Sequence, residues 1–271
     1  MNVERSRAGY CSGEFDLPTL VGLAIGSRNE SSVGIFLKVE PNTLIWKGRR
    51  EGDGSPVVYK MYRNRGCIGW IREGCFQFRV EREYQALSHL VRHGIRCSVP
   101  FFWTRGHDPE HGRYEILCMR EIQQATALTE LVSSGHQNAI DIGVLYVMVR
   151  HMHETGFYHG RLDLRNIVRG IDADGVSDYH IIDTPYAMIF PGSIAGTAMA
   201  WDDLRQLSGY VYRIWGTEVV RAGLIGYGLG KKESHKMMGI LPRSGVPLLM
   251  RNLKRFYFGL RLRFFYKYEI F

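Results

Sequence analysis

The residues whose types and spacing suit chemistry gather in one short stretch, HGRLDLRN, at positions 159–166. His159 opens it, Asn166 closes it seven residues later, and Asp183 follows at the end of the apolar run YHIID. An amide and a carboxylate supply the hard oxygen ligands that Mg²⁺ prefers. A helix, such a loop, a short hairpin and an acid at a strand end follow one another in proteins that transfer phosphoryl groups. The three side chains therefore indicate a site for a metal and a phosphate.

Each of these residues also has a plainer explanation when it is taken alone. A single histidine is commonly a hydrogen-bonded core residue, and an asparagine is common in turns. An aspartate shortly before Pro185 is typical of a turn or of a helix cap. What favours the functional interpretation is that all three occur together, in the order and spacing of one site.

A charged pair upstream supports the same interpretation. Lys60 lies in the strand-like run VVYKMY, where an ammonium among apolar neighbours is costly unless it is paired. An edge-strand lysine that points to water is the alternative. Glu83 follows on the apolar face of the next helix, three residues after Val80 and four before Leu87, whereas Glu81 lies off that face. In kinases a strand lysine and a helix glutamate of this kind hold the α- and β-phosphates of ATP.

Position 161 departs from the pattern. Such a loop carries an aspartate there, which orients or deprotonates the acceptor hydroxyl. This chain has Arg161, which can neither act as a base near neutral pH nor ligate magnesium. The nearest acid, Asp163, is the candidate substitute base. The alternative is a pseudokinase, a nucleotide-binding or scaffold protein in which Arg161 replaces the charge of magnesium or clamps a phosphate.

The elements that must position these residues follow an α+β order. One helix carries Val80, Tyr84, Leu87 and Val91 on a single stripe and stops at Gly94, and a second runs through 139–156 and stops at Gly156. The remaining predicted elements are strands at 34–39, 42–46, 56–62, 100–105 and 113–119, a hairpin around 172–178, and a helix over 200–216. This order predicts a small antiparallel-sheet lobe with one main helix, joined to a mostly helical lobe.

Three segments are predicted along the chain. Residues 1–33 form a loose leader, 34–122 the lobe that binds nucleotide phosphates, and 123–271 the lobe with the loop, the metal site and the acceptor side. The length of 271 residues and the 45% of apolar residues suit one two-lobed domain.

Over residues 34–215 the chain resembles the bacterial lipopolysaccharide kinases, the Kdo and heptose kinase branch of the protein-kinase-like fold. The stretches that carry the resemblance are VVYKMY, EYQALSHLVRHGIRCSVPFF, HETGFYHGRLDLRNIV, YHIIDTPYAM and DDLRQL. It implies that Lys60 binds the phosphates of ATP, that Glu83 positions Lys60, and that His159 supports the loop. Asn166 and Asp183 would hold Mg²⁺. The segment KVEPNTLIW lacks the G-x-G-x-x-G pattern of a phosphate-covering loop.

The implied activity is transfer of a phosphate from ATP to a sugar hydroxyl of a lipopolysaccharide core or a related glycolipid. The predicted catalytic set is His159, Arg161, Asp163, Asn166 and Asp183, with Lys60 and Glu83 as cofactor-binding residues. The net charge of +8 suits an anionic acceptor and disfavours a cationic, aminoglycoside-like one. A protein acceptor stays open, and nucleic acid is not expected because no recognised binding module is present.

The last feature concerns location. Five cysteines without a CxxC pair, and the lack of a secretory signal, favour a reducing, cytoplasmic compartment. No apolar run is long enough to span a bilayer. The C-terminal segment 251–271 is basic and amphipathic, which is typical either of a helix lying on a membrane surface or of a last helix packed on the helical lobe. With the resemblance, the first interpretation predicts peripheral contact with the inner face of the cytoplasmic membrane.

Overall fold

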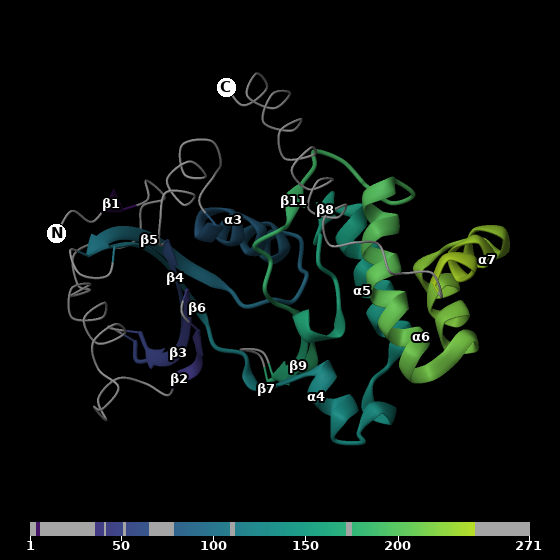
Figure 1. Ribbon diagram of the computed structural model, residues 1–271, viewed down its shortest axis with the longest axis horizontal. Helices are drawn as coiled ribbons and strands as arrows, with labels where there is room; N and C mark the ends of the chain where they lie inside the picture. The colour runs from purple at the N-terminus through teal and green to yellow at the C-terminus, as the bar shows by residue number, and fades with distance from the viewer. Residues whose placement is uncertain are drawn as a thin grey trace.

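The computed structural model describes residues 4–5, 36–40, 42–50, 53–64, 79–108, 112–171 and 175–241. A sheet and the helix α3 form one end of the molecule, and most of the other helices form the opposite end (Figure 1). The elements of the first end are β1 (Glu4–Arg5), β2 (Phe36–Glu40), β3 (Thr43–Arg49), β4 (Pro56–Asn64), α3 (Arg79–Arg92), β5 (Pro100–Asp108) and β6 (Gly112–Arg120). The strands pair antiparallel in the order β1-β5-β6-β4-β3-β2.

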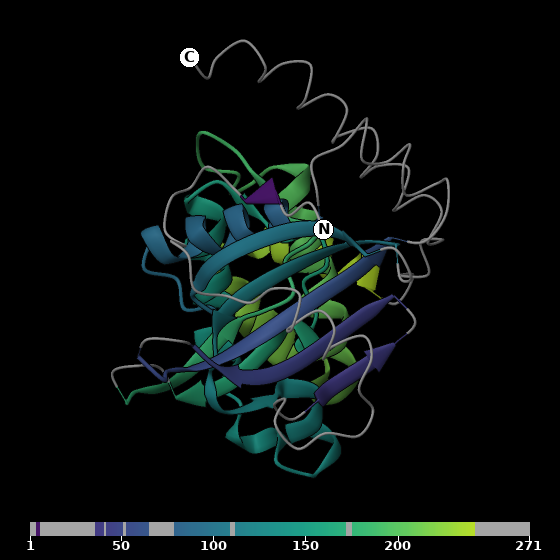
Figure 2. The ribbon, with the colours of Figure 1, turned by 90° about the vertical axis from the view of Figure 1, so that its left-hand side faces the viewer.

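The central strand β4 shows why this sheet can hold a charged residue. Side chains alternate between the two faces of a strand. Tyr59 and Met61 belong to a cluster on one face, with Trp46 from β3. Lys60 and Tyr62 point to the other face, where α3 packs, and both are buried. Figure 2 shows the sheet strands side by side in front of the helical end.

The helix α3 has the predicted position, but its buried stripe differs slightly. Val80 and Leu87 are buried as predicted, whereas Val91 is 40% exposed. Leu90 takes its place in the core. The positions i+3 and i+4 from Leu87 are equally compatible with one helix face, so the spacing alone could not separate Leu90 from Val91.

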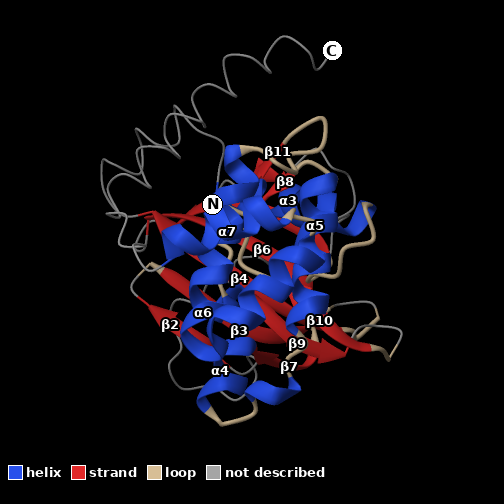
Figure 3. Cartoon of the chain, turned by 90° about the vertical axis from the view of Figure 1, so that its right-hand side faces the viewer, coloured by secondary structure: helices blue, strands red, loops and turns tan. Residues whose placement is uncertain are grey.

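The helical end contains β7 (Gln123–Ala127), α4 (Leu128–Ser133), η1 (Gln137–Ala139), α5 (Ile142–Glu154), β8 (Phe157–Tyr158), η2 (Leu164–Asn166), β9 (Ile167–Ile171), β10 (Ser177–Ile181), β11 (Met188–Ile189), α6 (Ala198–Tyr227) and α7 (Lys231–Ile240). Figure 3 shows these helices from their own side. Asp141 is the N-cap of α5, and its side chain accepts a hydrogen bond from the Val144 amide at 3.1 Å. It buries Leu145, Val149 and Met152. The short sheets β10-β9-β7 and β11-β8 connect the helices.

The helix α6 is two helices joined by a corner at Gly216, which has φ 81° and ψ −172°. One side chain of α5, His153, shows that the two halves fold back on each other. Its Nδ1 lies 2.8 Å from the Tyr227 hydroxyl and its Nε2 lies 3.4 Å from Asp203 Oδ2. In one straight helix about 24 residues would separate these partners by about 36 Å. The corner therefore brings both halves of α6 to the same imidazole.

The α+β fold class, with its antiparallel sheet, main helix and helical region, is confirmed. Residues 4–5 form β1, in which Arg5 pairs with Thr104 at the sheet edge, and the predicted leader over residues 1–33 stays a prediction. The strand β6 ends at Arg120 and β7 pairs with β9, near the predicted boundary at residue 122, which stays a prediction. The segment 251–271 lies outside the described residues. Among the described helices, none combines the length and apolar character that crossing a bilayer requires.

Candidate functional site

The Lys60 ammonium is the centre of a buried charge cluster between the sheet and the helical end. Its Nζ lies 2.8 Å from Glu83 Oε1 and 2.5 Å from Asp183 Oδ1. The Tyr62 hydroxyl donates a hydrogen bond to the second oxygen of Glu83 at 3.2 Å. Lys60 and Glu83 are 6% and 1% exposed, so water screens this pair little. Lys60 thus contacts Asp183, which lies 123 positions later in the chain.

The local folding of each segment explains this meeting. The alternation of β4 turns Lys60 toward α3, and the apolar stripe of α3 carries Glu83 inward. Glu81, the competing acid of the same helix, is only partly buried. Asp183 follows β10 and has φ 56°, a left-handed conformation that is uncommon outside glycine. Such backbone geometry costs free energy and is concentrated at functional sites.

The charges set the pKa values of this cluster. Burial disfavours a charged Lys60, but the carboxylates of Glu83 and Asp183 outweigh it and raise the lysine pKa well above its ordinary value. Burial likewise opposes ionisation of Asp183, and the Lys60 ammonium overcomes it, so the pKa of Asp183 is lowered. Lys60 and Asp183 are therefore charged at neutral pH, as a phosphate-binding lysine and a metal-binding carboxylate need to be.

His159 fixes the loop to the strand end that carries Asp183. Its ring is fully buried, with Nε2 3.3 Å from the Ile182 carbonyl and Nδ1 accepting from the Arg161 amide at 3.3 Å. Burial lowers the pKa of His159, although nearby carboxylates, Asp203 first, oppose this. The neutral ring that donates through Nε2 and accepts at Nδ1 satisfies both contacts. His159 thus supports the loop and does not face solvent.

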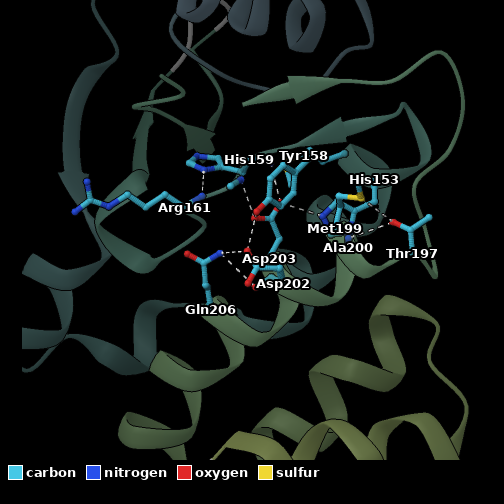
Figure 4. A network of polar contacts seen from close by, with 12 residues as sticks. His153, Tyr158, His159, Arg161, Thr197, Met199, Ala200, Asp202, Asp203 and Gln206 are labelled. Atoms are coloured by element: carbon cyan, nitrogen blue, oxygen red, sulfur yellow. Dashed lines mark hydrogen bonds and ion pairs between the residues drawn. The ribbon is translucent and has the colours of Figure 1, made fainter. Parts of the chain in front are cut away.

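The acid that holds the backbone of this loop is Asp203 in α6 (Figure 4). Its Oδ2 accepts from the His159 amide at 2.8 Å and its Oδ1 from the Gly160 amide at 2.9 Å. Asp203 is fully buried, so these charge-assisted bonds are strong. Sequence reasoning missed this role, although the pair of acids in DDLRQL was noted. The available signal was an acid on the buried face of an otherwise apolar helix, beside Leu204 and Leu207.

Asn166 is bonded through its backbone to Ile182, the residue before Asp183, and the side-chain oxygens of Asn166 and Asp183 are of the type that a hard cation binds. The side-chain Nδ2 of Asn166 donates to the Arg161 backbone carbonyl at 2.7 Å. Its backbone carbonyl accepts a hydrogen bond from the Ile182 amide at 2.9 Å. Asp183 uses Oδ1 for Lys60, and no hydrogen bond within the described chain engages its Oδ2. The described residues contain no group of three or more His, Cys, Asp and Glu side chains suited to a metal. Magnesium commonly binds through one or two protein oxygens and completes its shell with water and phosphate.

Arg161 and Asp163 have different surroundings. The backbone of Arg161 is held on both sides, by His159 Nδ1 and by Asn166 Nδ2, while its side chain is partly exposed and extends away from Asp203 (Figure 4). Asp163 is only 4% exposed and caps η2. Its carboxylate accepts from the Arg165 amide at 2.9 Å and from the Arg165 guanidinium at 2.7 Å. The candidate base is thus engaged with its neighbour Arg165.

No protein-family model and no curated protein matches the chain. A solved structure described as WaaP in complex with acyl carrier protein matches with a TM-score of 0.56 and 16% sequence identity. The match covers 90% of this chain and 97% of that chain. The chain has a kinase-like fold.

In the kinase-like fold the predicted site residues form two groups. Lys60, Glu83 and Asp183 are in direct contact. His159, Arg161 and Asn166 are joined by hydrogen bonds in the loop, and Ile182 links that loop to Asp183. Asp163 is not joined to either group by a side-chain contact, because it is bound to Arg165. The geometry brings the predicted residues together except for Asp163, and the chemical roles of all of them stay predictions.

Proposed function

We propose that this protein is an ATP- and Mg²⁺-dependent phosphotransferase whose acceptor is a sugar hydroxyl of a lipopolysaccharide core or a related glycolipid. The observation that carries the proposal is the Lys60 ammonium held between Glu83 and Asp183. Glu83 orients the ammonium, which binds the nucleotide phosphates, and Asp183 holds the metal beside them. The likeness in fold to the WaaP structure supports a kinase-like protein, and the resemblance of residues 34–215 to lipopolysaccharide kinases supports the acceptor class, as does the net charge of +8.

The metal would be held by Asp183 Oδ2 and the side-chain oxygen of Asn166. When bound, Mg²⁺ neutralises charge on the transferring phosphate. The protein's own contribution is to keep these oxygens in place. His159 and Asp203 hold the 159–166 loop through hydrogen bonds, and the Arg161 carbonyl accepts a hydrogen bond from the Asn166 side-chain amide. Catalysis in this class consists largely of positioning and charge stabilisation, which such a framework provides.

Activation of the acceptor hydroxyl is assigned to Asp163, the nearest acid to the expected position. A general base contributes typically about 10²–10⁴-fold, so a weak base would slow the reaction without abolishing it. To accept a proton, Asp163 must loosen its contact with the Arg165 guanidinium. We expect Asp163→Asn to lower kcat within that range while KM for ATP stays unchanged.

A pseudokinase is the second candidate, and Arg161 is the observation that favours it. An arginine at the place of the base, together with an acid already bound by Arg165, suits a protein that binds nucleotide without turnover. In that case Arg161 would bind a phosphate oxygen, as guanidinium groups do. Membrane contact through residues 251–271 is compatible with both candidates and stays a prediction.

The enzyme proposal is tested with purified protein, ATP, Mg²⁺ and lipopolysaccharide core lipid. We expect phosphate transfer by the wild type and none by Asp183→Ala, with Glu218→Ala, an exposed acid of α6, as the matched control. Equal rates for the wild type and Asp183→Ala would refute the enzyme proposal. Replacing Arg161 by aspartate separates the two candidates. A large gain in turnover indicates a lost base and a pseudokinase, whereas a loss indicates that Arg161 contributes to the reaction.

Nucleotide binding is tested separately by thermal unfolding. A ligand that binds only the folded protein raises stability by mass action. The enzyme and a nucleotide-binding pseudokinase both predict a shift with ATP, and the metal assignment predicts that Mg²⁺ enlarges it and that Asp183→Ala abolishes the enlargement. A wild type that shows no shift with ATP, with or without Mg²⁺, refutes the enzyme proposal and favours a scaffold protein that binds no nucleotide.

A further inference from the structure

A cavity of about 210 Å³ opens behind the connection between the two ends of the molecule. Its walls come from the loop after α3, from residues 120–122 and from β10. The two ends are joined here by backbone contacts, because the Ile181 amide donates to the Arg96 carbonyl at 2.9 Å. None of the lining residues belongs to the Lys60 cluster or to the 159–166 loop. The cavity is therefore separate from the proposed catalytic site.

One wall of the cavity is His180, a buried polar residue without a hydrogen bond. The side chain is 2% exposed, and neither ring nitrogen has a hydrogen-bond partner within the described chain. Burial and the nearby Arg96 lower the pKa of His180, and the Gly170 backbone and Asp178 oppose this. Gly170 lies near the ring, but its contact does not have the geometry of a hydrogen bond. A neutral imidazole offers one donor and one acceptor. Buried polar groups are nearly always satisfied in folded proteins, so these two nitrogens need a partner.

The charges of the lining leave one cation without a counter-ion. Arg96 Nε lies 3.0 Å from Asp178 Oδ2, and Glu121 accepts from Lys47 at 2.5 Å. The Arg120 guanidinium has no carboxylate partner among residues the structure describes, and lies 5.7 Å from the Phe101 ring centroid. Beside the two charged pairs, the cavity thus has an excess of one positive charge.

The rest of the lining is apolar. Val91, Ile95, Val99 and Ile122 contribute side chains from three of the surrounding segments. The volume of about 210 Å³ admits a small molecule. These walls suit a ligand with a negative charge at one end and a short carbon chain at the other.

We propose that this cavity binds a small organic carboxylate with a short carbon chain, for which butyrate is the probe. Its carboxylate oxygens accept hydrogen bonds from Arg120 and from the His180 N–H, and its chain lies against the valine and isoleucine side chains. Because the walls come from both ends of the molecule, the ligand contacts both. This inference does not rest on the proposed function.

The test uses the full chain and ligand-observed NMR titration with butyrate. Butyramide serves as the neutral isostere and inorganic phosphate as an anion without a carbon chain. We expect butyrate to bind, butyramide and phosphate to bind at least about tenfold more weakly, and Arg120→Gln to weaken butyrate by about tenfold or more. Arg221→Gln, an exposed arginine of α6, should leave butyrate binding unchanged.

His180→Leu gives an independent arm. Because the leucine removes two nitrogens that make no hydrogen bond, we expect the variant to fold and to bind butyrate more weakly. Equal binding of butyrate and butyramide, or an unchanged affinity in both variants, would overturn the proposal. If phosphate binds as tightly as butyrate, the cavity is a general anion site and the proposal of a carboxylate site is wrong. If ATP displaces butyrate, the cavity belongs to the nucleotide site, and the proposal of a separate site is wrong.

Discussion

At the scale of residues, the burial of the Lys60–Glu83 pair determines how much free energy of unfolding is lost when Lys60 is replaced. Lys60→Met leaves Glu83, which is 1% exposed, without its counter-ion. Removing one partner of a buried ion pair typically costs about 3–5 kcal/mol, so we expect a loss of about 3 kcal/mol in the free energy of unfolding. Urea denaturation measures it.

Lys38→Met is the matched control, because Lys38 pairs with Glu40 and their side chains are 49% and 53% exposed. Exposed pairs contribute about 0–1 kcal/mol. If both variants lose the same stability, the buried cluster has no special energetic role.

Asp183 should make the free energy of unfolding depend on pH in the acidic range. The ammonium of Lys60 lowers its pKa against the effect of burial. A carboxylate whose pKa is lower in the folded state stabilises that state above its unfolded pKa of about 4, and the contribution is lost as the pH falls below it. We therefore expect the difference in unfolding free energy between the wild type and Asp183→Asn to shrink from about pH 6 to about pH 3. A difference that is constant or grows with acid would contradict the Lys60–Asp183 contact.

At the scale of elements, α6 should act on the loop through Asp203. Asp203→Ala removes the acceptor of the His159 and Gly160 amides and leaves both donors buried. Bonds to charged groups contribute about 1.5–3 kcal/mol each, so we expect a loss of about 3 kcal/mol or more, measured by chemical denaturation.

The neighbouring Asp202→Ala is the control for that experiment. Asp202 contacts Tyr158, Arg205 and Gln206 from a partly exposed position. Its loss should therefore be smaller, about 1 kcal/mol. The reverse order would show that Asp203 does not anchor the loop.

Whole-molecule stability should decline in mild acid because buried histidines stay neutral in the folded chain. Burial is the main cause that lowers the pKa of His89, His159 and His180. The unfolded chain then binds protons first, so stability is complete above about pH 6.5 and falls as the pH decreases toward the folded pKa values. We expect unfolding free energies measured by urea denaturation to decrease from about pH 7 to about pH 5.

His180→Leu should flatten that dependence, because one of the three groups no longer titrates. His235→Leu, at an exposed position of α7, should not change its slope. A wild-type stability that is level or rises over this range would contradict the neutral state of the buried rings.

The sequence predicted the order of strands and helices because their patterns are local. The stripe of α3 and the N-cap and apolar face of α5 are readable within a dozen residues. Lys60 and Glu83 could be paired in advance because a strand face and a helix face constrain each other. Two-residue strands such as β8 and β11 carry too little pattern to recognise.

Other features depend on contacts between distant segments, which spacing does not encode. Asp203 lies 44 residues from the His159 amide that it binds. The engagement of Asp163 by Arg165 depends on the backbone conformation of a short 3₁₀ turn. The cavity at His180 requires three segments to be placed relative to one another. Such features follow only from the folded chain.

The corner in α6 has a consequence for assembly. Gly216 has φ 81°, which favours glycine, and a β-carbon there would meet no atom within 4 Å. Gly216→Ala therefore penalises the corner without a clash, and alanine favours continuous helix by about 1 kcal/mol over glycine. A straightened α6 would carry Tyr227 and α7 away from His153 and offer them to the same place on a second chain. We expect a domain-swapped dimer, detected by size-exclusion chromatography with light scattering. One glycine would then keep the molecule closed on itself.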